Sequence, residues 1–201
     1  TSFPGDMQVL PGNLSFAIFF QPGGWSKLFT VPMREITNRL YDAPLVVGAC
    51  VRDLWNRLGE CSSFRQRVTV VEKFLLSRVS CTPIAGRVGS AASYIFNQRG
   101  IVNLPGLAQR AGMGLRQFER RFQQETGSSP KVFARVARFQ AALDAKLTSP
   151  KRAWLDIAHA FGYYDQMHMI HDFEILAHNT PTQLISVLGD VRPPALADGE
   201  M

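Results

Sequence analysis

The spacing of apolar and polar residues divides the chain into a short β-like start and a long helical remainder. Residues 14–20 (LSFAIFF) form an apolar run rich in aromatic side chains, which predicts a buried strand. Residues 21–24 (QPGG) predict a turn, and residues 25–31 predict a second, shorter strand. Because two strands do not make a stable sheet alone, residues 1–32 either pack on the helices that follow or are the remnant of a larger β-rich region, and we favour the remnant.

From residue 33 onward the apolar positions follow the period of a helix. Residues 33–40 and 45–58 are predicted helices, and serines at 62–63 are predicted to cap a third helix that runs to about Val79. On this third helix the apolar residues form one stripe and the charged residues lie outside it. The two longer helices predict an antiparallel hairpin, whose apolar face serves either core packing or self-association.

A proline and two glycines within residues 80–89 predict a domain boundary, and helical spacing resumes after it. Asn103 and Asp165 are predicted N-caps, and a tail at 189–201 that contains Pro and Gly predicts disorder. The predicted helices span residues 91–99, 104–111, 114–126, 130–147, 153–161, 165–177 and 182–188.

A pattern of small, apolar, glycine and proline positions occurs twice in this helical region. The copies lie 50 residues apart up to a glycine turn and 51 residues apart after it, so the second turn contains one additional residue. The matched positions are Leu107, Ala108 and Gly112 with Ile157, Ala158 and Gly162, then Phe118, Phe122 and Pro130 with Met169, Phe173 and Pro181. Each copy predicts a short helix, a turn and a second helix, which is typical of a helix-turn-helix unit.

The predicted fold class is therefore mainly α, with two helix-turn-helix units joined by the long helix at 130–147. A helical hairpin and a short β-rich N-terminal remnant precede them. The chain has 201 residues, of which 46% are hydrophobic and 19% charged, as in a globular protein. No apolar run approaches the ~20 residues of a membrane span, so no membrane association is expected.

The N-terminus lacks the charged start and apolar run of a signal peptide, and it begins with Thr rather than Met. We therefore expect a fragment or a processed chain. The three cysteines are widely spaced and include no CxxC pair. Buried or free thiols in a reducing cytoplasm are the expected state, and no cofactor is expected.

Charge is distributed unevenly along the repeat. The formal net charge is +6 and the pI about 9.6, which permits a polyanionic partner. Between Arg99 and Arg138 there are eight basic and two acidic residues, so the first unit is expected to carry a charge equal to that of the whole chain. Between Ala153 and Val191 there are five acidic residues and no Lys or Arg. Phosphate binding is therefore expected mainly at the first unit.

The two copies resemble the double helix-turn-helix domain of AraC/XylS-type transcription regulators over residues 84–188. The first copy matches through Leu107-Ala108, Gly112-Met113, Arg120-Arg121-Phe122 and residues 125–130 (ETGSSP). The second matches through Ile157-Ala158, Phe161-Gly162-Tyr163, Asp165-Gln166, His168, Asp172-Phe173 and Thr180-Pro181. The PGG segment and the following VPMREITN resemble the end of the β-rich sensor half in some members.

This resemblance implies three regions: a partial sensor or dimerisation region at 1–82, a DNA-binding domain at 83–188 and the tail at 189–201. Within the first region, the β remnant is placed at 1–32 and helices at 33–80. The implied function is a sequence-specific, non-enzymatic transcription regulator that binds the major groove of double-stranded DNA. RNA polymerase is a further expected partner, and residues 45–79 are the expected homodimer contact.

The expected DNA-contacting residues lie on the second helix of each unit. Arg116, Glu119 and Arg120 are spaced i, i+3, i+4 and share one helix face. The full predicted set is Arg116, Gln117, Glu119, Arg120 and Arg121 in the first unit, and Gln166, His168 and His171 in the second. Arg121 is interpreted either as a phosphate contact or as a solvated helix residue. The second unit departs more from the family, which commonly has Arg at the position of His171.

Two alternatives use the divergent second unit differently. In one it contacts a protein partner such as RNA polymerase. In the other it binds a metal through histidines, with His168, His171, Asp172 and His178 as candidate ligands. An enzyme is disfavoured because the sequence has no Gly-rich phosphate loop, no G-x-S-x-G elbow and no HExxH motif.

Overall fold

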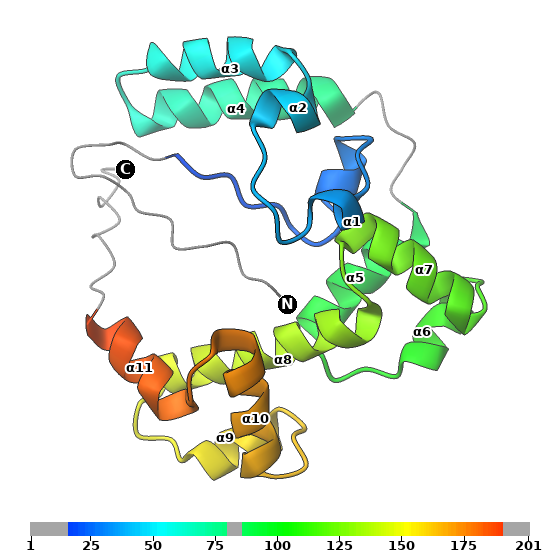
Figure 1. The fold of residues 1–201 in the computed structure, drawn as a ribbon, viewed down its shortest axis with the longest axis vertical. Helices are drawn as coiled ribbons and strands as arrows, with labels where there is room; N and C mark the ends of the chain where they lie inside the picture. The colour runs from blue at the N-terminus through cyan, green and yellow to red at the C-terminus, as the bar shows by residue number, and fades with distance from the viewer. Residues whose placement is uncertain (1–15, 80–85, 191–201) are drawn as a thin grey trace. The chain divides into compact units, whose positions relative to one another are not determined.

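The computed structural model describes residues 16–79 and 86–190, which fold mainly into helices (Figure 1). No strand forms in these ranges. A 3-10 helix, η1 (Trp25–Lys27), comes first. The α-helices that follow are α1 (Met33–Ile36), α2 (Ala43–Val47), α3 (Cys50–Gly59), α4 (Phe64–Val79), α5 (Arg87–Asn97), α6 (Leu104–Arg110), α7 (Leu115–Thr126), α8 (Pro130–Thr148), α9 (Trp154–Ala160), α10 (Gln166–Ala177) and α11 (Pro181–Asp190).

These elements form two compact units. Unit 1 contains the described residues up to Tyr94 together with residues 103–130, and unit 2 contains residues 95–102 together with the described residues from Lys131 onward. The predicted boundary at 80–89 lies partly outside the described residues, and α5 already begins at Arg87. Helix α11 continues to Asp190, two residues into the predicted tail, whose remainder lies outside the described residues.

The predicted strand at residues 25–31 is wrong, because this segment folds back on itself as a turn. Phe20, Trp25 and Phe29 pack together, with the Trp25 and Phe29 ring centroids 4.3 Å apart. The Trp25 Nε1–H donates to the Val31 carbonyl oxygen at 3.1 Å, which closes the segment locally. Of the predicted strand at 14–20, the described residues 16–20 form no strand, and residues 14–15 lie outside the description.

The helical hairpin in unit 1 forms from α3 and α4, which contact each other (Figure 1). Its core contains Val51, Leu54 and Val71. The predicted single helix at 45–58 is divided into α2 and α3 at Gly48, which has a positive φ of 96°. The predicted serine cap is present, since Ser63 Oγ accepts a hydrogen bond from the Gln66 backbone N–H at 3.3 Å.

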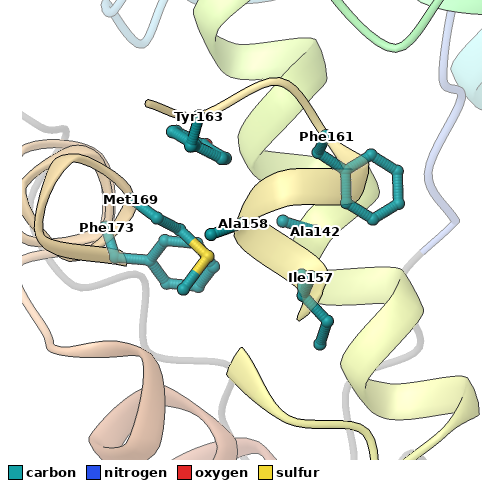
Figure 2. Packing of buried hydrophobic residues seen from close by; sticks show 7 residues of the cluster. All are labelled: Ala142, Ile157, Ala158, Phe161, Tyr163, Met169 and Phe173. Atoms are coloured by element: carbon teal, nitrogen blue, oxygen red, sulfur yellow. The ribbon is translucent and has the colours of Figure 1, made fainter. Parts of the chain in front are cut away.

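Unit 2 is built around one apolar cluster to which α8, α9 and α10 all contribute (Figure 2). Its buried members are Ala142, Ile157, Ala158, Phe161, Tyr163, Met169 and Phe173. The Phe139 ring of α8 packs on Phe173 of α10 with centroids 4.6 Å apart. This packing fixes α10 against the long helix.

A short segment that precedes α6 in the sequence, residues 95–102, also belongs to unit 2. Gly100 has φ +75° and lies so close to α8 that a Cβ atom there would stand 1.9 Å from the Ala134 carbonyl oxygen. Ile101 lies beside Gly162 in the turn after α9. Ile95 is fully buried. The segment therefore packs against α8 and against the turn after α9.

Candidate DNA-binding surface

Two helix pairs, α6–α7 and α9–α10, are built on the same backbone turn. Each first helix ends at a glycine in the left-handed region, Gly112 with φ 67° and Gly162 with φ 69°. The following residue reaches back in each case: the Met113 N–H donates to the Ala108 carbonyl, and the Tyr163 N–H to the Ala158 carbonyl, both at 3.0 Å. This pattern is a Schellman cap, so the sequence repeat corresponds to a repeat of backbone structure.

The two turns differ in length by one residue, which confirms the predicted insertion. Residues 111–114 connect the first helix pair, and residues 161–165 connect the second. Asp165 caps α10 through its Oδ1, which accepts from the His168 N–H at 2.7 Å. Gly114 at the same place before α7 offers no side-chain cap. Helix α7 is held instead by Phe118 and Phe122, both fully buried.

The first helix pair presents its predicted DNA-contacting residues to solvent. Arg116, Gln117, Glu119, Arg120 and Arg121 are all exposed on α7. In the described part of the chain, neither Arg116 nor Arg120 forms an ion pair. The guanidinium groups of both residues are therefore available to an external anion or base edge.

Arg121 lies where its charge also acts on Glu125, one turn further along α7. Burial raises the pKa of the Glu125 carboxyl, and the positive charge of Arg121 opposes that rise. The Glu125 Oε2 atom is buried and has no hydrogen-bond partner among the described residues. Arg121 is thus exposed and electrostatically coupled to a partly desolvated carboxyl group.

The second helix pair presents a different surface. His168 and His171 are exposed, and Gln166 is half-buried. The His168 ring packs edge-on against Tyr163 with centroids 5.5 Å apart. Of the candidate metal ligands on this helix, Asp172 is buried at 4% exposure.

Asp172 is buried because it pairs with the long helix. Its Oδ1 lies 2.6 Å from Arg135 Nε on α8. Arg138, one turn further along α8, stacks on the Tyr163 ring at 5.3 Å, and burial raises the pKa of the Tyr163 hydroxyl. These contacts tie α8 to α10 and to the turn before it.

The basic residues expected on the first helix-turn-helix unit are divided between the two compact units, because Arg99, Arg135 and Arg138 belong to unit 2. Of the eight basic residues between Arg99 and Arg138, three are engaged within unit 2: Arg135 with Asp172, Arg138 with Tyr163, and Arg99, which stacks on Phe161 at 5.5 Å. Residues 95–102 and 131–190 together carry seven basic and six acidic side chains, so unit 2 is nearly neutral rather than acidic.

A protein-family comparison decides the class of this surface. The family model described as a helix-turn-helix domain, of the AraC type, matches residues 107–186. The chain contains an AraC-type DNA-binding domain. The match supports a DNA-binding transcription regulator of that type, and the matched domain is a regulatory rather than a catalytic one. No curated protein and no solved structure matches the chain.

The matched range begins within α6 and includes the whole of α7, α8, α9 and α10. Nowhere in residues 16–79 and 86–190 do three His, Cys, Asp or Glu side chains come together as a metal site requires. The histidine metal site is therefore unsupported, and the buried pair with Arg135 explains why Asp172 is unavailable. None of the helices in those same ranges is long and apolar enough to cross a membrane.

The sequence prediction missed residues of the AraC-type domain that stand beside the predicted ones. Tyr164 and Met167 are 89% and 69% exposed at the start of α10. Lys151 and Arg152 are exposed just before α9, and the Arg152 carbonyl accepts from Lys146 Nζ at 2.7 Å. Met167 could have been predicted from the repeat, because it lies 51 residues after Arg116 and therefore at the corresponding position of the second copy.

Proposed function

We propose that the protein binds operator DNA through two helix-turn-helix units, the helix pairs α6–α7 and α9–α10, joined by α8. We further propose that the first pair supplies most of the affinity. The observation that carries this proposal is the exposure of Arg116 and Arg120 on α7 without an ion-pair partner among the described residues. The residues 51 positions later are Met167 and His171, which offer no permanent charge.

The exposed face of α7 has the side chains that read base pairs in the major groove. An arginine such as Arg116 or Arg120 can bind guanine through two hydrogen bonds, and Gln117 is suited to adenine. Glu119 can accept a hydrogen bond from the cytosine amino group. Arg121, further round the helix, is suited to a backbone phosphate, which would position the helix without reading sequence.

The second helix pair has weaker means of binding. Gln166, His168 and His171 are its polar residues toward the start of α10, and none of them carries a permanent positive charge. Lys151 and Arg152 before α9 provide charge for phosphate contacts. We infer that this pair adds to affinity and to the length of the recognised site, with a smaller share of the binding free energy.

Paired alanine substitutions test this division. Arg116→Ala with Arg120→Ala should reduce specific binding by about thirtyfold or more, since each bidentate arginine–guanine contact contributes about 1–3 kcal/mol. Gln166→Ala with His171→Ala, a matched double change on α10, should cost roughly tenfold or less. Affinity is measured by fluorescence anisotropy at one salt concentration, with a duplex selected from random DNA.

The control for nonspecific effects is Lys73→Ala with Arg65→Ala, two exposed basic residues on α4. This variant loses the same charge and should bind the selected duplex nearly as the parent does. A larger loss from the α10 pair than from the α7 pair would contradict the proposed division. Absence of specific binding by the parent chain would contradict the function itself.

A further inference from the structure

The outer surface of α10 near its start is apolar where that of α7 is basic. Met167 occupies the position that corresponds to Arg116, and it is 69% exposed. Because α7 and α10 start directly after their N-caps, Gly114 and Asp165, and bury the same later positions of each helix, this correspondence holds for the structure as well as for the sequence. Met167 therefore stands at the scaffold position from which Arg116 is proposed to reach a base.

Tyr164 adds a second large side chain at this place. It lies between Tyr163, which is buried, and Asp165, whose carboxylate caps α10. Both neighbours are fixed, so the Tyr164 side chain is held outward at the start of the helix, where it is 89% exposed. Single exposed apolar residues are common on protein surfaces, but here two adjoin the residues proposed to face the groove.

We propose that the second helix pair reads thymine, with Met167 and Tyr164 contacting the thymine 5-methyl group. This inference rests on the proposed function. The thymine methyl is the one apolar group that a base pair presents in the major groove of unmodified DNA. Guanine, by contrast, is read best by Arg or Lys, and neither occurs on α9 or α10.

The other groups at this surface fit the same target. The Met167 side chain is unbranched and polarisable, so it can follow the contour of a methyl group without needing a hydrogen bond. Gln166 precedes it and suits the adenine paired with such a thymine. Lys151 and Arg152 supply charge for the phosphates on the same unit.

Replacing thymine by uracil tests the contact because it removes only the methyl group. Full-length protein is used with a duplex selected from random DNA, and the second half-site is defined as the one whose protection is lost in the Gln166→Ala, His171→Ala variant. Uracil in that half-site should weaken binding about fourfold for each contacted methyl, the size expected for burying one methyl group. In Met167→Ala, replacing thymine by uracil should change the affinity little. In Met167→Leu, the same replacement should still weaken binding.

Val187→Ala is the matched control, since Val187 is an exposed apolar residue on α11. This variant should retain the parent's sensitivity to uracil. If two grooves are protected but uracil has the same effect in the parent and in Met167→Ala, the thymine contact is overturned and the proposed function stands. If only one groove is protected, the apolar surface serves a protein partner instead, and the inference is also overturned. Loss of all specific binding would overturn both.

Discussion

At the scale of single residues, Glu125 is the most unusual group on α7. It lies on the helix proposed to enter the major groove, yet one carboxylate oxygen is buried without a hydrogen bond in the described residues. Its pKa is raised by burial despite the nearby charge of Arg121. A carboxyl group in this setting destabilises the folded state once it ionises.

Glu125→Gln should therefore stabilise the protein at neutral pH. Below the usual glutamate pKa of 4.5, the carboxyl is protonated in both the folded and the unfolded state. As the pH rises, the unfolded state ionises first, so the free energy of unfolding of the parent falls until the folded carboxyl ionises as well. Glutamine cannot ionise, so the variant should lack this fall.

Urea unfolding between pH 4 and pH 8 measures the effect. The parent and Glu125→Gln should be similar at the acidic end, and the variant should be the more stable at pH 7. Glu119→Gln, which changes an exposed carboxyl on the same helix, should alter stability little. A Glu125→Gln variant less stable than the parent at pH 7 would show that the carboxylate is stabilising.

The environment of a residue could be predicted from the sequence where the residues that determine it lie nearby on the same helix. Exposed Arg116 and Arg120 were predictable because helical period separates them from the buried Phe118 and Phe122 on the same helix. The ion pair of Arg135 could not be predicted in this way, because its partner Asp172 lies on another helix, 37 residues later in the sequence. Net charge along a segment does not reveal which side chains are already paired.

At the scale of elements, the contact between α8 and α10 holds the second helix pair in shape. The Arg135–Asp172 pair adds a charged contact to the apolar packing of Phe139 on Phe173. Asp172 is 5% exposed as a side chain and Arg135 31% exposed. The cost of breaking the pair is therefore somewhat below that of a fully buried one.

Asp172→Ala should lower the free energy of unfolding by about 2–3 kcal/mol, because it leaves the Arg135 guanidinium partly buried without its carboxylate. Glu174→Ala removes the same charge from an exposed site on the same helix and should change stability by less than about 0.5 kcal/mol. Chemical denaturation followed by circular dichroism compares them. Equal midpoints for the two variants would mean that the ion pair does not hold α10.

Most helices from residue 33 onward were predictable because apolar spacing and caps such as Asn103 and Asp165 act locally. The strand at 25–31 was not, because aromatic residues suit a strand and a compact turn equally well. The contact between Trp25 and Phe29 and the hydrogen bond to Val31 distinguish the turn from a strand. The spacing of apolar residues does not predict these contacts.

At the scale of the whole molecule, the proposed binding of DNA by both helix pairs, which the 19-residue α8 joins in the sequence, predicts an operator with two half-sites on one face of the duplex. Insertion of 5 base pairs between the half-sites should turn the second one to the opposite face of the duplex. Affinity should then fall to that of a duplex whose second half-site is scrambled.

Quantitative footprinting on the parent and inserted duplexes provides the measurement. A matched duplex with the same 5 base pairs inserted outside both half-sites should bind as the parent duplex does. Full affinity and protection of both half-sites after the central insertion would contradict the expected binding to one face of the duplex. Such a result would point instead to two units that bind independently of each other.

The placement of residues 95–102 has a consequence for how this protein can be divided. Those residues come before the first helix pair in the chain, yet Gly100 and Ile101 pack into unit 2, beside Ala134 and Gly162. A fragment that begins at Lys131 would keep α8 to α11 but lose this packing. Recombination at a single junction before α8 would therefore transfer the second helix pair without the segment that packs on its long helix and on its turn.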